Sequence, residues 1–192
     1  MVKIDEKTIK ELGENKDEIR GVDFKTDEGF ILGKWGKEGI ERVEKEMKKM
    51  GSPLSYKEIS IFKFYPMGFR TLSLLAIKDV FEMSDKEIED MGKEAPKHSL
   101  FIKILIRYFF SFEKFVKKVP GGWRKHHTTG KLEIRDYSLE KKYIILRLKD
   151  HQAHPLYCSR YLLGYWVGIA EIVLKEKNVF ANHLLSGLQP CP

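Results

Sequence analysis

Hydrophobic positions in the first two thirds of the chain recur at spacings of three and four residues, the period of an α-helix. Residues 40–50 follow this spacing, and Gly51 comes directly after them as a natural helix C-cap. The pattern predicts an amphipathic helix that ends before Ser52-Pro53. A second apolar run, over residues 69–81, predicts a well-buried helix.

The next two helices have recognisable ends. Ser84-Asp85-Lys86-Glu87 is a capping-box sequence, and it opens a helix that we expect to stop before Pro96. A long apolar helix is predicted over residues 99–119, and Pro120-Gly121-Gly122 is expected to end it.

The N-terminal part lacks a regular pattern. Residues 4–20 are polar and weakly helical, and residues 21–36 contain four glycines among aromatic and aliphatic residues. This mixture predicts a folded loop or an irregular hairpin whose aromatic residues pack on the core. We therefore assign residues 1–36 to an N-terminal arm or irregular segment and residues 37–192 to one ligand-binding-like α+β domain.

Apolar and polar residues alternate at residues 131–135 and 143–148, which predicts two antiparallel strands joined by a turn at residues 138–142. A helix is expected over residues 156–175 and a last strand over residues 178–185. This order predicts an α+β fold. In it, a helical layer packs on a small antiparallel β-sheet, with a long helix of the C-terminal half against the sheet.

Composition narrows the class of protein. The chain has 192 residues, of which 42% are hydrophobic, so it can form one domain with a proper core. No apolar run reaches the roughly 20 residues that span a bilayer, and the first residues lack the apolar core of a signal peptide. Two cysteines are too few for a disulfide scaffold. These features predict a soluble, cytoplasmic protein.

The charge favours a solvated surface over a nucleic-acid site. The net charge is +7, but lysine and glutamate alternate, as in residues 41–49, at spacings that pair them on a helix face. The compact basic and aromatic cluster is Trp123-Arg124-Lys125-His126-His127. It could bind nucleic acid by stacking and charge, or form a loop with Trp123 in the core.

Two patterns on the apolar helices suggest packing or a pocket. Gly164 and Gly168 stand four apart, so a bare helix face could lie on the sheet or on a partner helix, or could leave room for a ligand. Aromatic residues on the two long helices either fill the core or enclose an apolar ligand pocket. The candidate pocket residues are Tyr108, Phe112, Phe115, Tyr161, Tyr165 and Trp166.

The sequence contains few catalytic or metal-binding motifs. The chain has no nucleophile-elbow, phosphate-loop, dinucleotide-binding or His-Glu-x-x-His motif, so we expect no enzymatic activity. His151, His154 and Cys158 have a loosely zinc-like spacing, and His183 and Cys191 add one imidazole and one thiol. The alternative is a buried structural cysteine with surface histidines.

The segment from His154 to Gly168 resembles the four-vinyl-reductase, or hydrocarbon-binding, family. Its members show a Cys, a Gly six residues later and another Gly on the same helix, which Cys158, Gly164 and Gly168 match. The tail His183-x3-Gly187-x3-Cys191 is similar to the closing Cys-x3-Gly-x3-Cys of that family. The resemblance covers residues 37–191, and its specific part lies near the C-terminal end.

The resemblance implies a fold shared with haem-dependent nitric-oxide-binding domains and vesicle-transport (TRAPP) subunits, a helical layer on an antiparallel sheet. The haem sensors carry a proximal His, but residues 111–116 offer none at the comparable place, so we do not expect haem. Cys158, His183 and Cys191 would permit zinc, since zinc accepts imidazole or thiolate.

The expected function is a non-enzymatic sensory or binding module for a small apolar molecule, acting as a homodimer or with a signalling partner protein, and without a membrane span. The first alternative is a nucleic-acid-binding regulator that uses the Trp123–His127 cluster. The second is an assembly subunit with no ligand.

Overall fold

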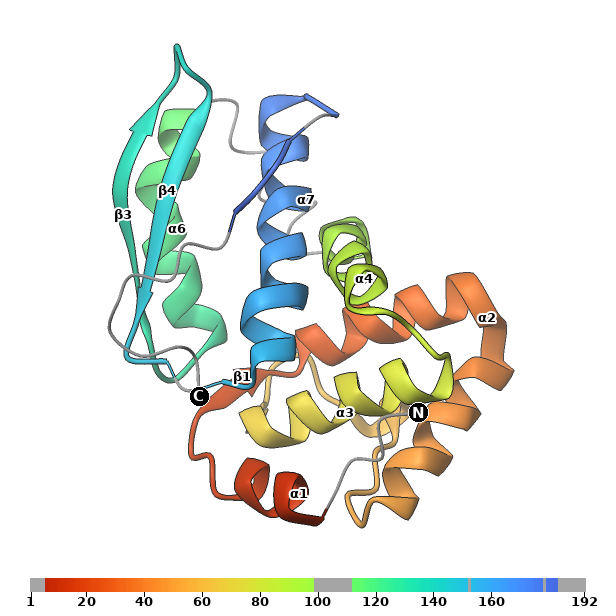
Figure 1. The fold of residues 1–192 in the computed structure, drawn as a ribbon. Helices are drawn as coiled ribbons and strands as arrows, with labels where there is room; N and C mark the ends of the chain where they lie inside the picture. The colour runs from red at the N-terminus through yellow and green to blue at the C-terminus, as the bar shows by residue number, and fades with distance from the viewer. Residues whose placement is uncertain (1–5, 99–111, 152, 178, 183–192) are drawn as a thin grey trace.

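The computed structural model describes residues 6–98, 112–151, 153–177 and 179–182, and Figure 1 shows the fold. The elements in chain order are α1 (Glu6–Gly13), β1 (Glu18–Arg20), α2 (Val22–Lys49), the 3₁₀-helix η1 (Tyr56–Glu58), β2 (Phe64–Pro66), α3 (Met67–Val80), α4 (Asp85–His98), α6 (Phe112–His126), β3 (Lys131–Ser138), β4 (Tyr143–Lys149), the π-helix η2 (Leu156–Tyr161) and α7 (Leu162–Leu174). Helices therefore pack against two small antiparallel sheets, β1–β2 and β3–β4, which confirms the predicted α+β class.

The predicted hairpin is present. Strands β3 and β4 pair from Lys131 with Lys149 to Ser138 with Tyr143, and a turn over residues 139–142 joins them. Helix α6 packs on β3, and α7 lies between α6 and α4 (Figure 1). The core lies where α2, α3, α4 and η2 meet.

The folded loop or irregular hairpin expected at residues 21–36 is wrong, because this segment forms the first part of α2. Phe24 and Ile31 stand two helical turns apart and are fully buried, in the same cluster as Val43 and Met47. Burial of this face outweighs the roughly 1 kcal/mol that each glycine costs a helix. The helix kinks at Gly36, whose φ of 66° suits glycine. Residues 6–36 thus share the core with the rest of the described chain.

Two helices continue through the prolines that were expected to end them. Helix α4 runs through Pro96, which is buried together with Ala95, and α6 runs through Pro120 and the two glycines after it. A proline inside a helix removes one backbone hydrogen bond and crowds the preceding turn. Val119 and Trp123, on either side of Pro120, are buried in the core cluster, so tertiary packing outweighs the local cost.

Some expectations fall outside the described residues. Of the predicted long helix over residues 99–119, only the part from Phe112 onward is described. Of the last strand expected at residues 178–185, residues 179–182 are described and form no strand. Within the part of the chain that is described, no helix combines the length and apolarity needed to cross a membrane.

The bare glycine face of the C-terminal helix packs on a partner helix. A Cβ atom on Gly164 would overlap the backbone carbonyl oxygen of Glu89, and one on Gly168 would overlap that of Lys93, both on α4. Gly92 of α4 lies equally close to the backbone of η2. The sequence left three possible neighbours for this glycine face, namely the sheet, a partner helix or a ligand. In the structure, the neighbour is helix α4.

Candidate ligand pocket

A cavity of about 470 Å³ lies between α6 and the segment formed by η2 and α7. We call it the α6–α7 cavity. Its apolar wall includes Phe115 and Val119 from α6 and Tyr165, Trp166 and Ile169 from α7. Apolar and aromatic surface of this kind is typical of sites for small apolar ligands.

The structure brings together four of the six residues expected to form a pocket. Phe115, Tyr161, Tyr165 and Trp166 all line the α6–α7 cavity. Tyr108 lies outside the described residues, and Phe112 is described only as the first residue of α6. Gly164 and Gly168 face α4, so they serve close packing of two helices.

A carboxyl group also lines the cavity. Asp23 sits in the first turn of α2 and is half-buried, while its Oδ2 atom is inaccessible to solvent and has no hydrogen-bond partner among the described residues. Burial raises the pKa of Asp23 to about 7; nearby Arg70 opposes this shift and Asp27 adds to it. The group is therefore close to half-ionised at neutral pH.

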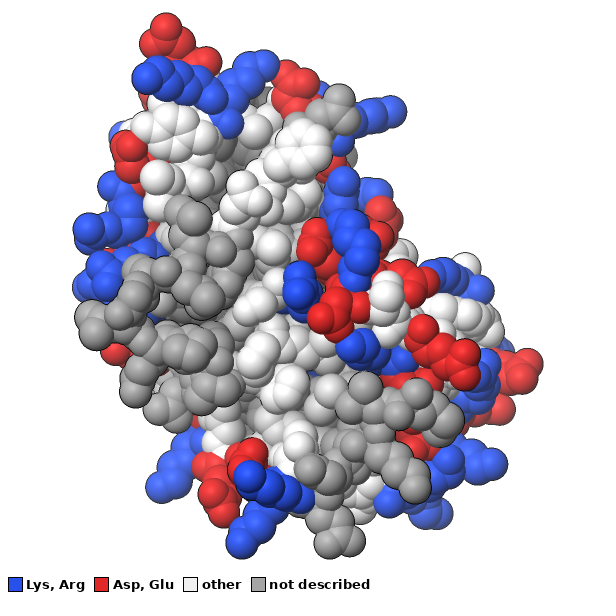
Figure 2. All heavy atoms as spheres, viewed as in Figure 1, with Lys and Arg blue, Asp and Glu red and all other residues white. Residues whose placement is uncertain are grey.

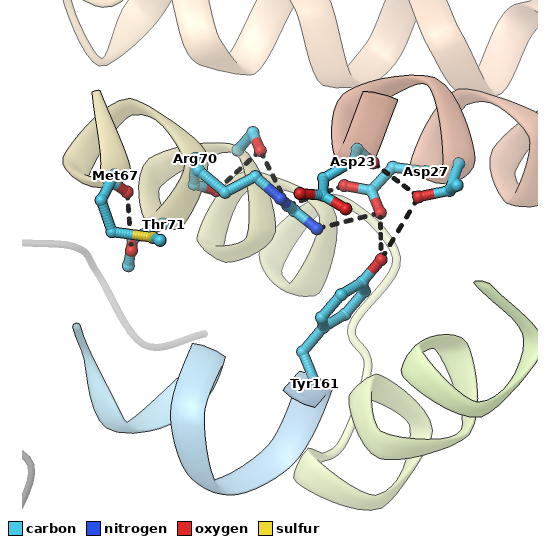
Figure 3. Close-up of polar contacts among 8 residues, drawn as sticks. Asp23, Asp27, Met67, Arg70, Thr71 and Tyr161 are labelled. Carbon is cyan, nitrogen blue, oxygen red and sulfur yellow. Dashed lines mark hydrogen bonds and ion pairs between the residues drawn. The ribbon is translucent and has the colours of Figure 1, made fainter. Parts of the chain in front are cut away.

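Behind Asp23 lies a fully buried ion pair that joins three elements (Figure 3). Arg70 of α3 donates from Nη2 to Asp27 Oδ1 at 3.1 Å, and its Nη1 lies 2.7 Å from Oδ2 in an ion pair. The Tyr161 hydroxyl of η2 donates to the same Oδ1 at 3.0 Å. Both oxygens of Asp27 are thus engaged, which is how a buried charge becomes tolerable. This network fixes the floor of the cavity.

The second polar group at the floor is a histidine–tyrosine pair. His127 Nε2 lies 2.9 Å from the Tyr157 hydroxyl, and the His127 ring stacks on Trp123 with centroids 3.6 Å apart. Trp123 Nε1 donates to the Thr129 carbonyl at 3.0 Å. Burial lowers the pKa of His127 well below its ordinary value, so the ring is neutral at pH 7.

The basic cluster at residues 123–127 is not a stacking surface. Trp123 is 4% exposed and His127 8%, as expected if the tryptophan belongs to the core. Burial lowers the pKa of His126 to about 4, so neither histidine of the cluster is charged at pH 7. Arg124 and Lys125 are exposed. Figure 2 shows Lys and Arg beside Asp and Glu over much of the viewed face. Nucleic-acid binding by this cluster stays a prediction, with Arg124 and Lys125 as its exposed cations.

The metal hypothesis gains no support from the described residues. Cys158 is buried and its Sγ lies 3.8 Å from the Ala153 carbonyl oxygen, while His183 and Cys191 are outside the described residues. His154 Nδ1 accepts a hydrogen bond from the Leu156 amide at 3.1 Å, so it caps the start of η2. No group of three or more His, Cys, Asp or Glu side chains in the described ranges is placed to hold a metal ion.

The sequence interpretation missed Asp23, Asp27 and Arg70. Asp23 and Asp27 stand four apart, which places both on one face of a helix, but the segment was interpreted as a loop. Arg70 is the one charged residue between Met67 and Ile77, a run that is otherwise apolar or small. A lone charge on a buried helix face is a signal for a buried partner.

Comparisons with protein-family models, with curated proteins and with solved structures find no match. The likeness to the four-vinyl-reductase family rests on the motif around Cys158, Gly164 and Gly168.

Proposed function

We propose that the protein is a non-enzymatic binding or sensory module whose α6–α7 cavity holds a small, mainly apolar molecule. The observation that carries this proposal is the cavity itself, at about 470 Å³. Ligand pockets typically measure about 300–1,000 Å³. An apolar cavity of about 150 Å³ is already enough to bind benzene, so this one suits a larger molecule.

The wall of α6 supports the proposal. Gly121 and Gly122 line the cavity in mid-helix, and a Cβ atom on either would meet no other atom within 4 Å. Two glycines cost a helix about 2 kcal/mol relative to alanine. Close packing does not explain them here, in contrast to Gly164 and Gly168. Their effect is to keep side chains out of the cavity.

A fluorescent apolar probe, N-phenyl-1-naphthylamine, tests the proposal. It should bind the protein with a blue shift and one-site saturation. Gly122→Leu should weaken binding by about tenfold or more, because the leucine takes up space in the cavity. Its melting temperature should stay at or above that of the wild type, since leucine is a better helix former than glycine.

Gly33→Leu is the matched control. Gly33 is an exposed glycine of helix α2 with no atom within 4 Å of a Cβ position, and it is not part of the cavity wall. This variant should bind the probe as the wild type does. Failure of the wild type to bind, or equal binding by Gly122→Leu, would refute the proposal and favour an assembly subunit without a ligand.

Occupancy would be passed on to a second copy of the chain or to a signalling partner. Helix α6 is both a wall of the cavity and the helix that packs on β3. A ligand that shifts α6 would therefore shift the hairpin, whose outer residues Tyr137, Leu139 and Ile145 are exposed. Light scattering with and without saturating probe would show whether the oligomeric mass changes.

A further inference from the structure

The floor of the α6–α7 cavity contains one more carboxyl group than its internal cation can match. Both Nη atoms of Arg70 are engaged by Asp27, at 2.7 and 3.1 Å. Asp27 also accepts the hydroxyl of Tyr161. Arg70 Nε is buried and has no hydrogen-bond partner among the described residues, and Arg70 also acts on Asp23 through its charge. Two carboxyl groups thus lie near one guanidinium, and the negative charge of one of them has no matching cation (Figure 3).

Within the described part of the chain, Asp23 also lacks a hydrogen-bond donor for one of its carboxylate oxygens. Its Oδ2 is shielded from solvent and accepts no hydrogen bond from the described residues, although Asp23 belongs to the cavity wall. Buried polar atoms are nearly always paired in native proteins, so each exception calls for an explanation. Asp23 as a residue borders the cavity, so a cation inside the cavity would balance its unmatched charge.

The rest of the wall suits a cation at that position. Tyr165 and Trp166 present aromatic rings to the cavity, and the faces of such rings attract ammonium groups. Tyr157 keeps its proton because burial raises its pKa well above the ordinary value. His126, also in the wall, is neutral at pH 7 because burial lowers its pKa to about 4.

The lysines of the wall do not contradict this choice. Lys117, Lys118 and Lys125 border the cavity from α6, and all three are exposed residues. Exposed charges are screened by water and salt within about 10 Å. Asp23 is on α2, on the inner side, where its charge acts through a medium of lower dielectric constant.

We propose that the cavity selects an apolar molecule that carries a primary or substituted amine, and that the Asp23 carboxylate binds its ammonium group. This inference rests on the proposed function, and it adds the chemical class of the ligand. The tail of the molecule occupies the apolar space between Phe115 and Ile169, and the ammonium group lies at the floor, beside Asp23.

Three competitors with the same hydrocarbon chain test the inference: octylamine, octanol and octanoate. Each is titrated against bound N-phenyl-1-naphthylamine at pH 7.5, octanol below its solubility limit and the other two below their critical micelle concentrations. Octylamine should displace the probe at concentrations about tenfold or more below octanol, and octanoate should be the weakest, because a second carboxylate would face Asp23.

Asp23→Asn is the diagnostic variant and Asp90→Asn the matched control. Asp90 is exposed on α4 and pairs with Lys86 at 3.0 Å, so its substitution removes the same charge away from the cavity. Asp23→Asn should still bind the probe but bring octylamine to within about twofold of octanol. Asp90→Asn should keep the wild-type ranking.

The outcomes separate this inference from the proposed function. Absence of probe binding by the wild type would refute the proposed function. Probe binding with octanol equal to octylamine, or with octanoate the best competitor, would overturn the amine specificity and leave the proposed function standing. If Asp23→Asn does not fold, the wild-type ranking of the three competitors decides alone.

Discussion

Gly164→Ala should destabilise the protein, although alanine is the better helix former. An added Cβ would overlap the carbonyl oxygen of Glu89 and lie 2.8 Å from its carbonyl carbon and 3.0 Å from the Lys93 amide nitrogen. All three atoms belong to the backbone of α4, so no side-chain rotation can relieve the contact. The helices α4 and α7 must move apart.

The magnitude follows from two opposing terms. Overpacking of a core costs about 1–3 kcal/mol, and a backbone obstacle favours the upper end of this range. Replacing glycine by alanine in a helix gains up to about 1 kcal/mol. We expect a net loss of about 2 kcal/mol, which lowers the melting temperature of a domain of this size by about 4–8 °C.

Thermal and urea unfolding followed by circular dichroism measure this difference, with Gly33→Ala as the control. Gly33 is helical, exposed and free of neighbours within 4 Å of a Cβ, so only the propensity gain remains there. Gly33→Ala should be up to about 1 kcal/mol more stable than the wild type. If Gly164→Ala is as stable as Gly33→Ala, the close packing of α4 on α7 is refuted. Gly164→Leu should be worse than Gly164→Ala.

Three further predictions concern the buried charges. Arg70→Met should lower the free energy of unfolding, measured in urea, by about 3–5 kcal/mol, because Asp27 loses its cation. The double variant with Asp27→Asn should regain part of this stability. A loss below about 1 kcal/mol for Arg70→Met would contradict the role of the pair. Octylamine affinity should fall by about tenfold in total between pH 8 and 5 and then level off near that of octanol, since protonation of Asp23, whose pKa is about 7, removes the binding charge. A flat profile between pH 5 and 8 would contradict it. His151 should contribute a loss of stability of at most roughly 3 kcal/mol as pH falls from 6.5 towards 4, because burial lowers its pKa from 6.5 to about 4 and the unfolded chain takes up the proton first. Asp23 and Asp27, whose pKa values burial raises to about 7 and about 6, contribute with the opposite sign. The share of His151 is therefore measured as the difference between the wild type and His151→Gln in melting temperature, which should grow smaller as pH falls.

The pH profile of octylamine binding has a defined set of neighbouring groups. Arg70 and Asp27 lie behind Asp23, and Tyr157, Tyr161 and Tyr165 face it from η2 and α7. Burial raises the pKa of each of these tyrosines, so they stay protonated between pH 5 and 8. Within this group, the profile in that range reports on the aspartates, and Asp23→Asn identifies the share of Asp23.

Signals that act between near neighbours could be predicted from the sequence. The capping box is one: Ser84 Oγ donates to Glu87 Oε2 at 2.9 Å, and the Ser84 amide donates to the same oxygen at 2.8 Å. The alternation that predicts β3 and β4 is another, and Gly51, with φ of 73°, follows the end of α2. These interactions depend on residues a few positions apart, so their energies are set by local sequence.

Local signals failed where packing over a longer range outweighed them. The glycines of residues 21–36 and the prolines at 96 and 120 predicted breaks, yet α2, α4 and α6 continue through them. A glycine or a proline inside a helix destabilises that helix by about 1 to 3 kcal/mol relative to alanine. Burying a large apolar side chain such as Phe24 stabilises by about 1.5–3 kcal/mol, and several such side chains lie on each of these helices.

The sequence by itself determined the apolar character of the α6–α7 cavity, because aromatic residues at helical spacing must face either a core or a pocket. Only the tertiary structure decided what lies at its floor. Asp27 pairs with Arg70 across 43 residues and with Tyr161 across 134, so neither partner is visible in a local pattern. Close packing of α2, α3 and η2 brings these groups together, and the same packing buries Asp23 Oδ2 and places Asp23 in the wall of the cavity. The reason is physical: a buried charge is tolerated only where the fold supplies its partner, and the partner is chosen by contacts that the chain makes with its distant parts.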